Sequence, residues 1–146
     1  MFGGRSAQVD DPVLGTLDRH DGQWEGQLRW SHSRHPVGLT VDRPDTAPTA
    51  EDRATFEALA RDYPALRAGL EDALYRLWET VRDSLEAPPD VSGSLELWAR
   101  MEVQGVALRA DGRADLIYGF AGDSPVEGAF IVSVRGHEVR PVEYVE

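Results

Sequence analysis

The sequence predicts an α+β domain, in which one curved antiparallel sheet packs against two helices. Three observations predict it: apolar residues alternate with polar ones over residues 13–41, recur at helical spacing over 51–85, and alternate again over 103–145. Helices with one apolar face need a sheet face to bury it. With 146 residues, 41% of them hydrophobic, the chain is expected to form one domain around one core.

Three strands are expected before the helices. They are Val13–Leu17, Gln23–Trp30 after an Asp21-Gly22 turn, and Val37–Val41. Side chains alternate across a strand, so one side of the second strand carries its apolar residues, Trp24, Gly26, Leu28 and Trp30. Residues 1–11 offer little to bury, and we expect them to form a flexible arm.

Two helices are expected next. Thr49 is a good N-cap, and Asp52 has the spacing of the capping-box acid. Pro64 suits the first turn of a second helix, where no backbone N–H is needed, and this helix is predicted to reach Leu85. We expect Trp78 in the core, and the apolar side of the Gln23–Trp30 strand to be covered by Leu70, Leu74, Trp78 and Val81.

The last third returns to strands. Residues 95–101 fit either a helical turn or the start of a strand. The expected order is therefore three strands, two helices and four strands, with the last four at Val103–Leu108, Leu116–Phe120, Phe130–Val134 and Val139–Val145. Strands joined by hairpins are antiparallel.

Charge and composition exclude several functions. The net charge is −11, which disfavours nucleic acid and favours a basic protein partner. There is no cysteine, and no apolar run approaches the ~18 residues that span a membrane. The first residues lack the apolar core of a secretory signal. We therefore expect a cytoplasmic protein without a membrane partner or a cofactor.

No motif for a catalytic nucleophile or a phosphate-binding loop occurs, which favours a non-catalytic protein. The weak metal candidates are His32 and His35, in a polar loop where nearby acids such as Asp42 could complete a zinc site. Solvated loop histidines are the favoured interpretation. Trp98 does not fit a regular helical or strand pattern. It either covers one end of the core or is exposed and anchors a partner.

Two segments carry a family resemblance. Residues 11–30 read DPVLGTLDRHDGQWEGQLRW, and residues 107–136 read ALRADGRADLIYGFAGDSPVEGAFIVSVRG, with an Asp111-Gly112 turn. Together with the order of the elements, they resemble a family of small bacterial domains of unassigned function, over roughly Asp11 to Glu143. Members of such families often resemble immunity or accessory proteins beside secreted toxins. The resemblance implies a non-catalytic protein-binding domain that neutralises a toxin.

The alternative is a small enzyme or a metal- or ligand-binding domain, with a site where His32, His35, Asp42 and the 121–128 loop converge. The edge strands, expected at residues 13–17 and 139–145, could pair between copies. Charged residues and Pro141 protect the second edge, and we expect a monomer or a weak homodimer.

Overall fold

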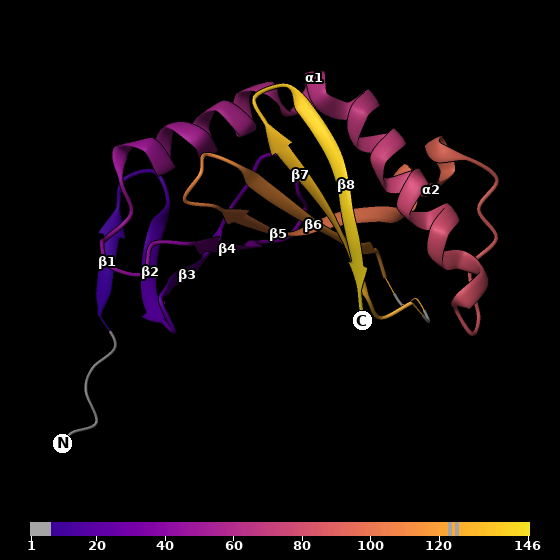
Figure 1. Ribbon diagram of the computed structural model, residues 1–146, viewed down its shortest axis with the longest axis horizontal. Helices are drawn as coiled ribbons and strands as arrows, with labels where there is room; N and C mark the ends of the chain where they lie inside the picture. Colours follow the sequence, from indigo (N-terminus) through magenta and orange to yellow (C-terminus); the bar gives the residue numbers. More distant parts are fainter. Residues whose placement is uncertain (1–6, 123, 125) are drawn as a thin grey trace.

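Eight strands lie in chain order across one sheet in the computed structural model, which describes residues 7–122, 124 and 126–146 (Figure 1). The strands are β1 (Gln8–Asp11), β2 (Gly15–His20), β3 (Gln23–Leu28), β4 (Val37–Val41), β5 (Met101–Leu108), β6 (Ala114–Phe120), β7 (Ala129–Arg135) and β8 (Glu138–Val145). Between β4 and β5 come helix α1 (Ala50–Val81), the 3₁₀ turn η1 (Arg82–Ser84) and helix α2 (Ser94–Arg100). The α+β class is confirmed.

The sheet is mixed, and this corrects the expected antiparallel sheet. Strands β4 and β5 are parallel, while all other neighbouring pairs are antiparallel. The chain leaves the end of β4 and returns through α1 and α2 to start β5 beside it. The hairpin rule does not apply to this long crossover. The predicted order was also wrong, because four strands, not three, precede the helices in the described residues.

The additional strand is β1, in the segment expected to be a flexible arm. It pairs with β2 from Gln8 to Asp11, so β1, not residues 13–17, forms this edge of the sheet. The Asp11 carboxylate accepts hydrogen bonds from the N–H groups of Val13 and Leu14, both at 2.9 Å, and pairs with Arg53 of α1 at 2.8 Å. These bonds fix the β1–β2 turn to the helix. Residues 1–6 of the expected arm lie outside the described residues.

Helix α1 begins as predicted. Thr49 is the N-cap, and Thr49 and Asp52 form the reciprocal capping box. Asp52 is buried, and Arg43 donates three hydrogen bonds to its carboxylate, at 2.9 and 3.2 Å to Oδ1 and at 3.0 Å to Oδ2. Because this ion pair satisfies the Asp52 carboxylate, the start of α1 is anchored to the segment that follows β4.

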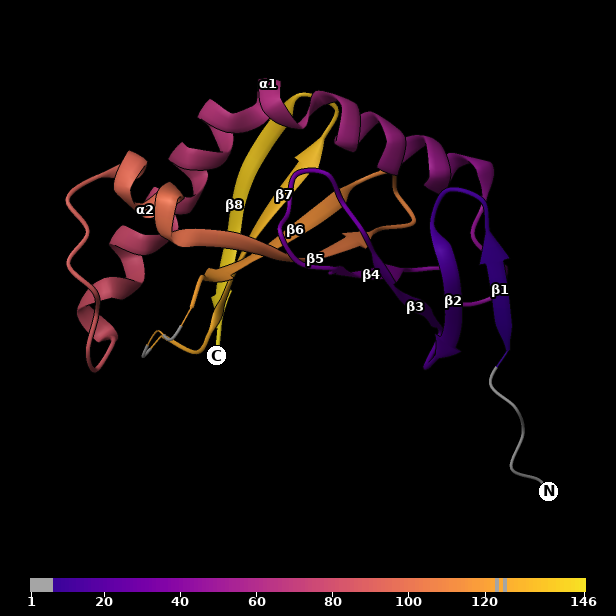
Figure 2. The same cartoon turned by 180° about the vertical axis from the view of Figure 1, so that it is seen from behind.

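The division into two helices at Pro64 was wrong, because α1 runs continuously through this residue to Val81. Figure 1 and Figure 2 show α1 bending midway along its length as it arches over one side of the sheet. Proline inside a helix is a common cause of such a bend. The second helix of the fold is instead α2, which forms from the segment that fitted either a helix or a strand.

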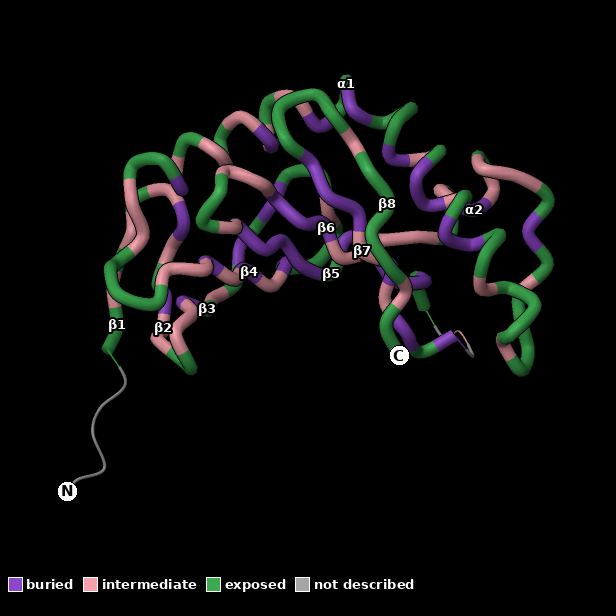
Figure 3. Tube along the Cα trace, in the orientation of Figure 1, coloured by how far each residue is buried: buried purple, intermediate pink, exposed green. Residues whose placement is uncertain are grey.

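The core lies between α1 and the sheet, where buried residues gather in Figure 3. The alternation predicted for the second strand is confirmed: Trp24, Leu28 and Trp30 are buried. Trp78 is also buried, as expected, but its ring packs on Phe120 and Phe130 of β6 and β7.

The prediction that residues 70–81 cover the second strand was therefore wrong, because the contacts of Trp30 come from the first half of α1. Trp30 packs on Phe56 and Tyr63, with ring centroids 6.3 and 4.7 Å apart. Helix α1 therefore contacts both halves of the sheet: Phe56 and Tyr63 pack on Trp30, which follows β3, whereas Tyr63 also bonds Tyr118 of β6 and Trp78 packs on β6 and β7.

Gly26 occupies a position where β2 and β3 come too close for a side chain. A Cβ on Gly26 would lie 2.6 Å from the carbonyl oxygen of Thr16 and 2.7 Å from Leu17 Cδ2. Both distances are shorter than any van der Waals contact. In the Trp24-Glu25-Gly26 segment, Trp24 is therefore buried, Glu25 is exposed, and Gly26 allows β2 and β3 to approach closely.

Candidate functional site

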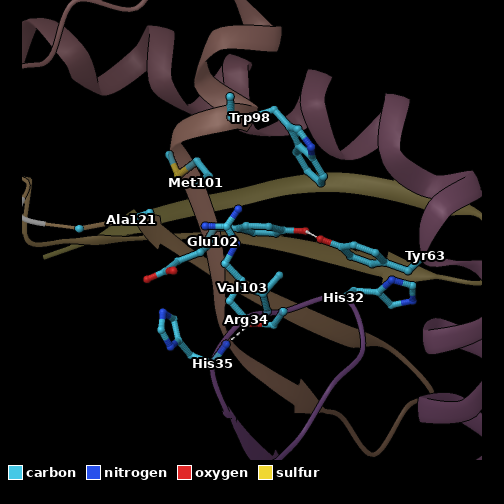
Figure 4. Close-up of a pocket in the computed structure, with 13 residues that line it drawn as sticks. His32, Arg34, His35, Tyr63, Trp98, Met101, Glu102, Val103 and Ala121 are labelled. Carbon is cyan, nitrogen blue, oxygen red and sulfur yellow. Dashed lines mark hydrogen bonds between the residues drawn. The ribbon is translucent and has the colours of Figure 1, made fainter.

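A cavity of about 470 Å³ opens beside the start of β5, where several elements meet (Figure 4). Its lining comes from the loop between β3 and β4, from α1, α2, β5 and β6, and from the residues after β6. The lining residues are His32, Ser33, Arg34, His35, Tyr63, Trp98, Ala99, Met101, Glu102, Val103, Tyr118, Ala121 and Gly122. Ligand-binding cavities commonly have volumes of about 300–1,000 Å³.

His32 has a structural role at this site. Pro64 has no N–H, so it cannot bond the carbonyl of Ala60 four residues earlier in α1. His32 Nε2 lies 2.8 Å from this carbonyl oxygen, and because a carbonyl only accepts, the imidazole donates. The ring of His32 also packs against Trp30 and Tyr63, with centroids 5.3 and 4.9 Å apart. The loop histidine thus replaces a helix hydrogen bond.

Two tyrosine hydroxyls meet at the buried side of the cavity. The hydroxyl oxygens of Tyr63 and Tyr118 lie 2.6 Å apart, and the two residues are 8% and 2% exposed. Burial raises the pKa of Tyr118 well above 10, and it also raises the pKa of Tyr63. Both phenols therefore keep their protons at neutral pH.

Trp98 completes an aromatic wall. Its ring lies 6.4 Å from the Tyr63 ring and 6.0 Å from the Tyr118 ring, between centroids. The Arg67 guanidinium lies over the Trp98 ring, 5.6 Å from its centroid, at cation–π distance. The side chain is partly buried and lines the cavity, so it packs on the core while part of it stays accessible.

The zinc site that the sequence left open is not assembled in the described residues. His32 and His35 line the same cavity, but Asp42 follows the far end of β4, where its N–H donates to Leu108. His20 ends β2, at the opposite end of β3 from the His32 loop. Over residues 7–122, 124 and 126–146, no three His, Cys, Asp or Glu side chains form a group that could hold a metal ion.

The remaining predicted convergence is partial. Ala121 and Gly122, at the start of the 121–128 loop, line the cavity with the two histidines, while residues 123 and 125 lie outside the described residues. The tyrosine pair was missed, because alternation predicts only that Tyr118 is buried. The sequence did contain a signal for the pair. Tyrosine instead of phenylalanine at two core positions indicates that each buried hydroxyl has a hydrogen-bond partner.

No helix in the described part of the chain is long and apolar enough to cross a membrane. Comparison with protein-family models, curated proteins and solved structures found no match to this chain.

Proposed function

We propose that the protein is a non-catalytic binding domain whose partner is a basic protein. The observation that carries this proposal is the way the chain uses its positive charge. Of the 14 arginines that the structure describes, 11 lie within 4.0 Å of a carboxylate of the same chain. Most arginine charge is therefore neutralised internally.

The excess negative charge lies on carboxylates at the surface. Several carboxylates have no arginine within 4.0 Å among the described residues. They include Asp18, Glu25, Glu57, Glu79, Glu86, Asp90 and Glu143. Asp18 and Glu25 are direct cross-strand neighbours of β2 and β3, and like charges in this position destabilise a sheet. A cationic partner would relieve this repulsion and would be steered toward the domain.

Within this class, the family resemblance supports an immunity protein that neutralises a toxin in the bacterial cytoplasm. The free protein in this proposal is a monomer or a weak homodimer, because the edge strand β8 contains Pro141 and the charged Glu138 and Arg140, which disfavour pairing with another copy. A toxin-like gene beside the gene of this protein would support the assignment. Rescue of bacterial growth when both genes are expressed together tests it directly.

The experiment for the broader proposal is capture of the partner from native lysate, followed by measurement of the association rate against ionic strength. We expect a basic partner and a rate that falls steeply with added salt. The Asp18→Lys/Glu25→Lys variant should associate more slowly than the wild type. The Glu79→Lys/Glu86→Lys variant changes the net charge equally at another place, so the comparison shows which surface faces the partner. An acidic partner, or a rate that does not depend on salt, would contradict the proposal.

A second candidate function is a small-ligand-binding domain, and the cavity beside His32 and His35 favours it. The cavity has the volume of a ligand site, an aromatic wall and a buried hydroxyl pair. Titration of the purified protein with small molecules, followed by calorimetry, tests this function independently of any protein partner.

A further inference from the structure

The cavity beside His32 has more hydrogen-bond donors than the described residues use. Two phenols carry two O–H groups, and the single bond between Tyr63 and Tyr118 uses one of them. Over residues 7–122, 124 and 126–146, neither hydroxyl has a further hydrogen-bond partner. The second O–H therefore lacks an acceptor although both side chains are more than nine-tenths buried, which is costly unless something in the cavity accepts it.

Arg34 supplies a positive charge to the same cavity. It lines the wall, and no carboxylate among the described residues lies within 4.0 Å of it, whereas most other arginines of the chain are paired. Glu102 also lines the cavity, but Figure 4 shows its carboxylate on the opposite side of the view from the tyrosine hydroxyls, with the Arg34 guanidinium between them. The part of the cavity near the tyrosines therefore combines a cation with a neutral donor.

The rings beside these donors favour a flat, apolar body. Trp98 and Tyr118 line the cavity with their ring planes inclined at 49°, and Tyr63 adds a third ring. Met101 and Val103 of β5 extend this apolar wall. Aromatic side chains prefer to contact another ring in offset or edge-on geometry.

We propose that this cavity binds a small aromatic carboxylic acid, with the ring of the ligand against Trp98 and Tyr118 and its carboxylate toward Arg34 and the free phenol O–H. The inference rests on the second candidate function and names the ligand class for it. A carboxylate accepts several hydrogen bonds, and guanidinium and phenol donors match it.

Isothermal titration calorimetry at neutral pH with three probes of one shape tests this inference. The probes are 3-phenylpropionate, 3-phenylpropanamide and 3-phenylpropylamine, which share the phenyl ring and differ in the charge of the polar end. We expect 3-phenylpropionate to bind at one site per chain. The amide and the amine should bind at least about tenfold more weakly, because each loses a charge-assisted hydrogen bond.

Two variants connect the binding to the residues. Arg34→Gln should weaken 3-phenylpropionate about tenfold and leave the amide unchanged. Arg29→Gln is the matched control, because Arg29 is exposed in the same loop region and lines a neighbouring recess instead of this cavity. A Tyr63→Phe/Tyr118→Phe variant keeps both rings and removes both O–H groups, and it should weaken the acid without affecting the amine.

The outcomes separate the inference from the function on which it rests. Equal affinity for the acid and the amide, or equal effects of Arg34→Gln and Arg29→Gln, would overturn the assignment of an acid. Binding of the amine in place of the acid would overturn it too, while keeping the cavity as a ligand site. If none of the three probes binds at millimolar concentration, the ligand class is wrong, and the second candidate function is wrong as well if the wider titration with small molecules also finds no binding.

Discussion

The hydrogen bond from His32 to Ala60 exists because Pro64 cannot make it, and this predicts an energetic coupling between His32 and Pro64. His32→Phe keeps a ring beside Trp30 and removes the donor 2.8 Å from the Ala60 carbonyl. A net hydrogen bond contributes about 1 kcal/mol, so this variant should lose about 1 kcal/mol of unfolding free energy. For a domain of this size, the melting temperature should fall by about 2–4 °C.

The same substitution should have almost no effect in a Pro64→Ala background. Alanine restores the N–H at position 64, and the Ala60 carbonyl then has its helical partner again. Pro64→Ala alone should stabilise the protein, because proline inside a helix is about 3 kcal/mol less favourable than alanine before tertiary compensation.

Guanidinium chloride unfolding of the four proteins, wild type, two single variants and the double variant, gives the coupling energy. We expect about 1 kcal/mol. If His32→Phe has the same cost in both backgrounds, His32 does not replace the missing helix bond, and the structural role assigned to it is wrong.

Three further predictions concern the fold. Trp78→Ala should destabilise the protein by about 3–5 kcal/mol in chemical unfolding, because it empties a fully buried site, and an unchanged midpoint would remove Trp78 from the core. Gly26→Ala should cost about 1–3 kcal/mol by overpacking against the Thr16 carbonyl, and a neutral effect in the same assay would mean that β2 can shift. Burial alone would raise the pKa of Asp52, but the hydrogen bonds and charge of Arg43 lower it below 3.8. Asp52 therefore stabilises the fold above its unfolded pKa near 3.8 and loses this effect as pH falls through its lower folded pKa. Asp52→Asn should reduce stability at neutral pH and reduce it less in acid, so a pH-independent difference between the two unfolding curves would contradict this account.

Local patterns in the sequence predicted local structure well. The Thr49–Asp52 capping box and the alternation around Trp24 were both readable, because the interactions that decide them lie within a few residues. The division of the helices at Pro64 failed because its compensation comes from His32, which is distant in sequence. No local pattern indicates that a loop side chain will replace a helix hydrogen bond.

Long-range pairing was the other feature that the sequence could not predict. Strands β4 and β5 are parallel because of the path of α1 and α2. Strand β1 pairs with β2, and its last residue, Asp11, forms an ion pair with Arg53 of α1. The cavity depends on the same long-range geometry. In the sequence, Tyr63 and Tyr118 each have the pattern of an ordinary core residue. Only the fold brings their hydroxyl oxygens within 2.6 Å of each other.

The parallel β4–β5 pair divides the sheet into two halves, each made of strands that neighbour one another in the chain. Each half needs only short loop closures, whereas the pair between them requires the whole helical crossover to be in place. We therefore expect β4–β5 to form late in folding and to be the joint at which the two halves separate in partial unfolding. The cavity lies at the starting ends of these two strands, since the loop before β4 and the first residues of β5 both line it. A ligand held there would bridge the joint, and hydrogen exchange at β4 and β5 would slow when it binds.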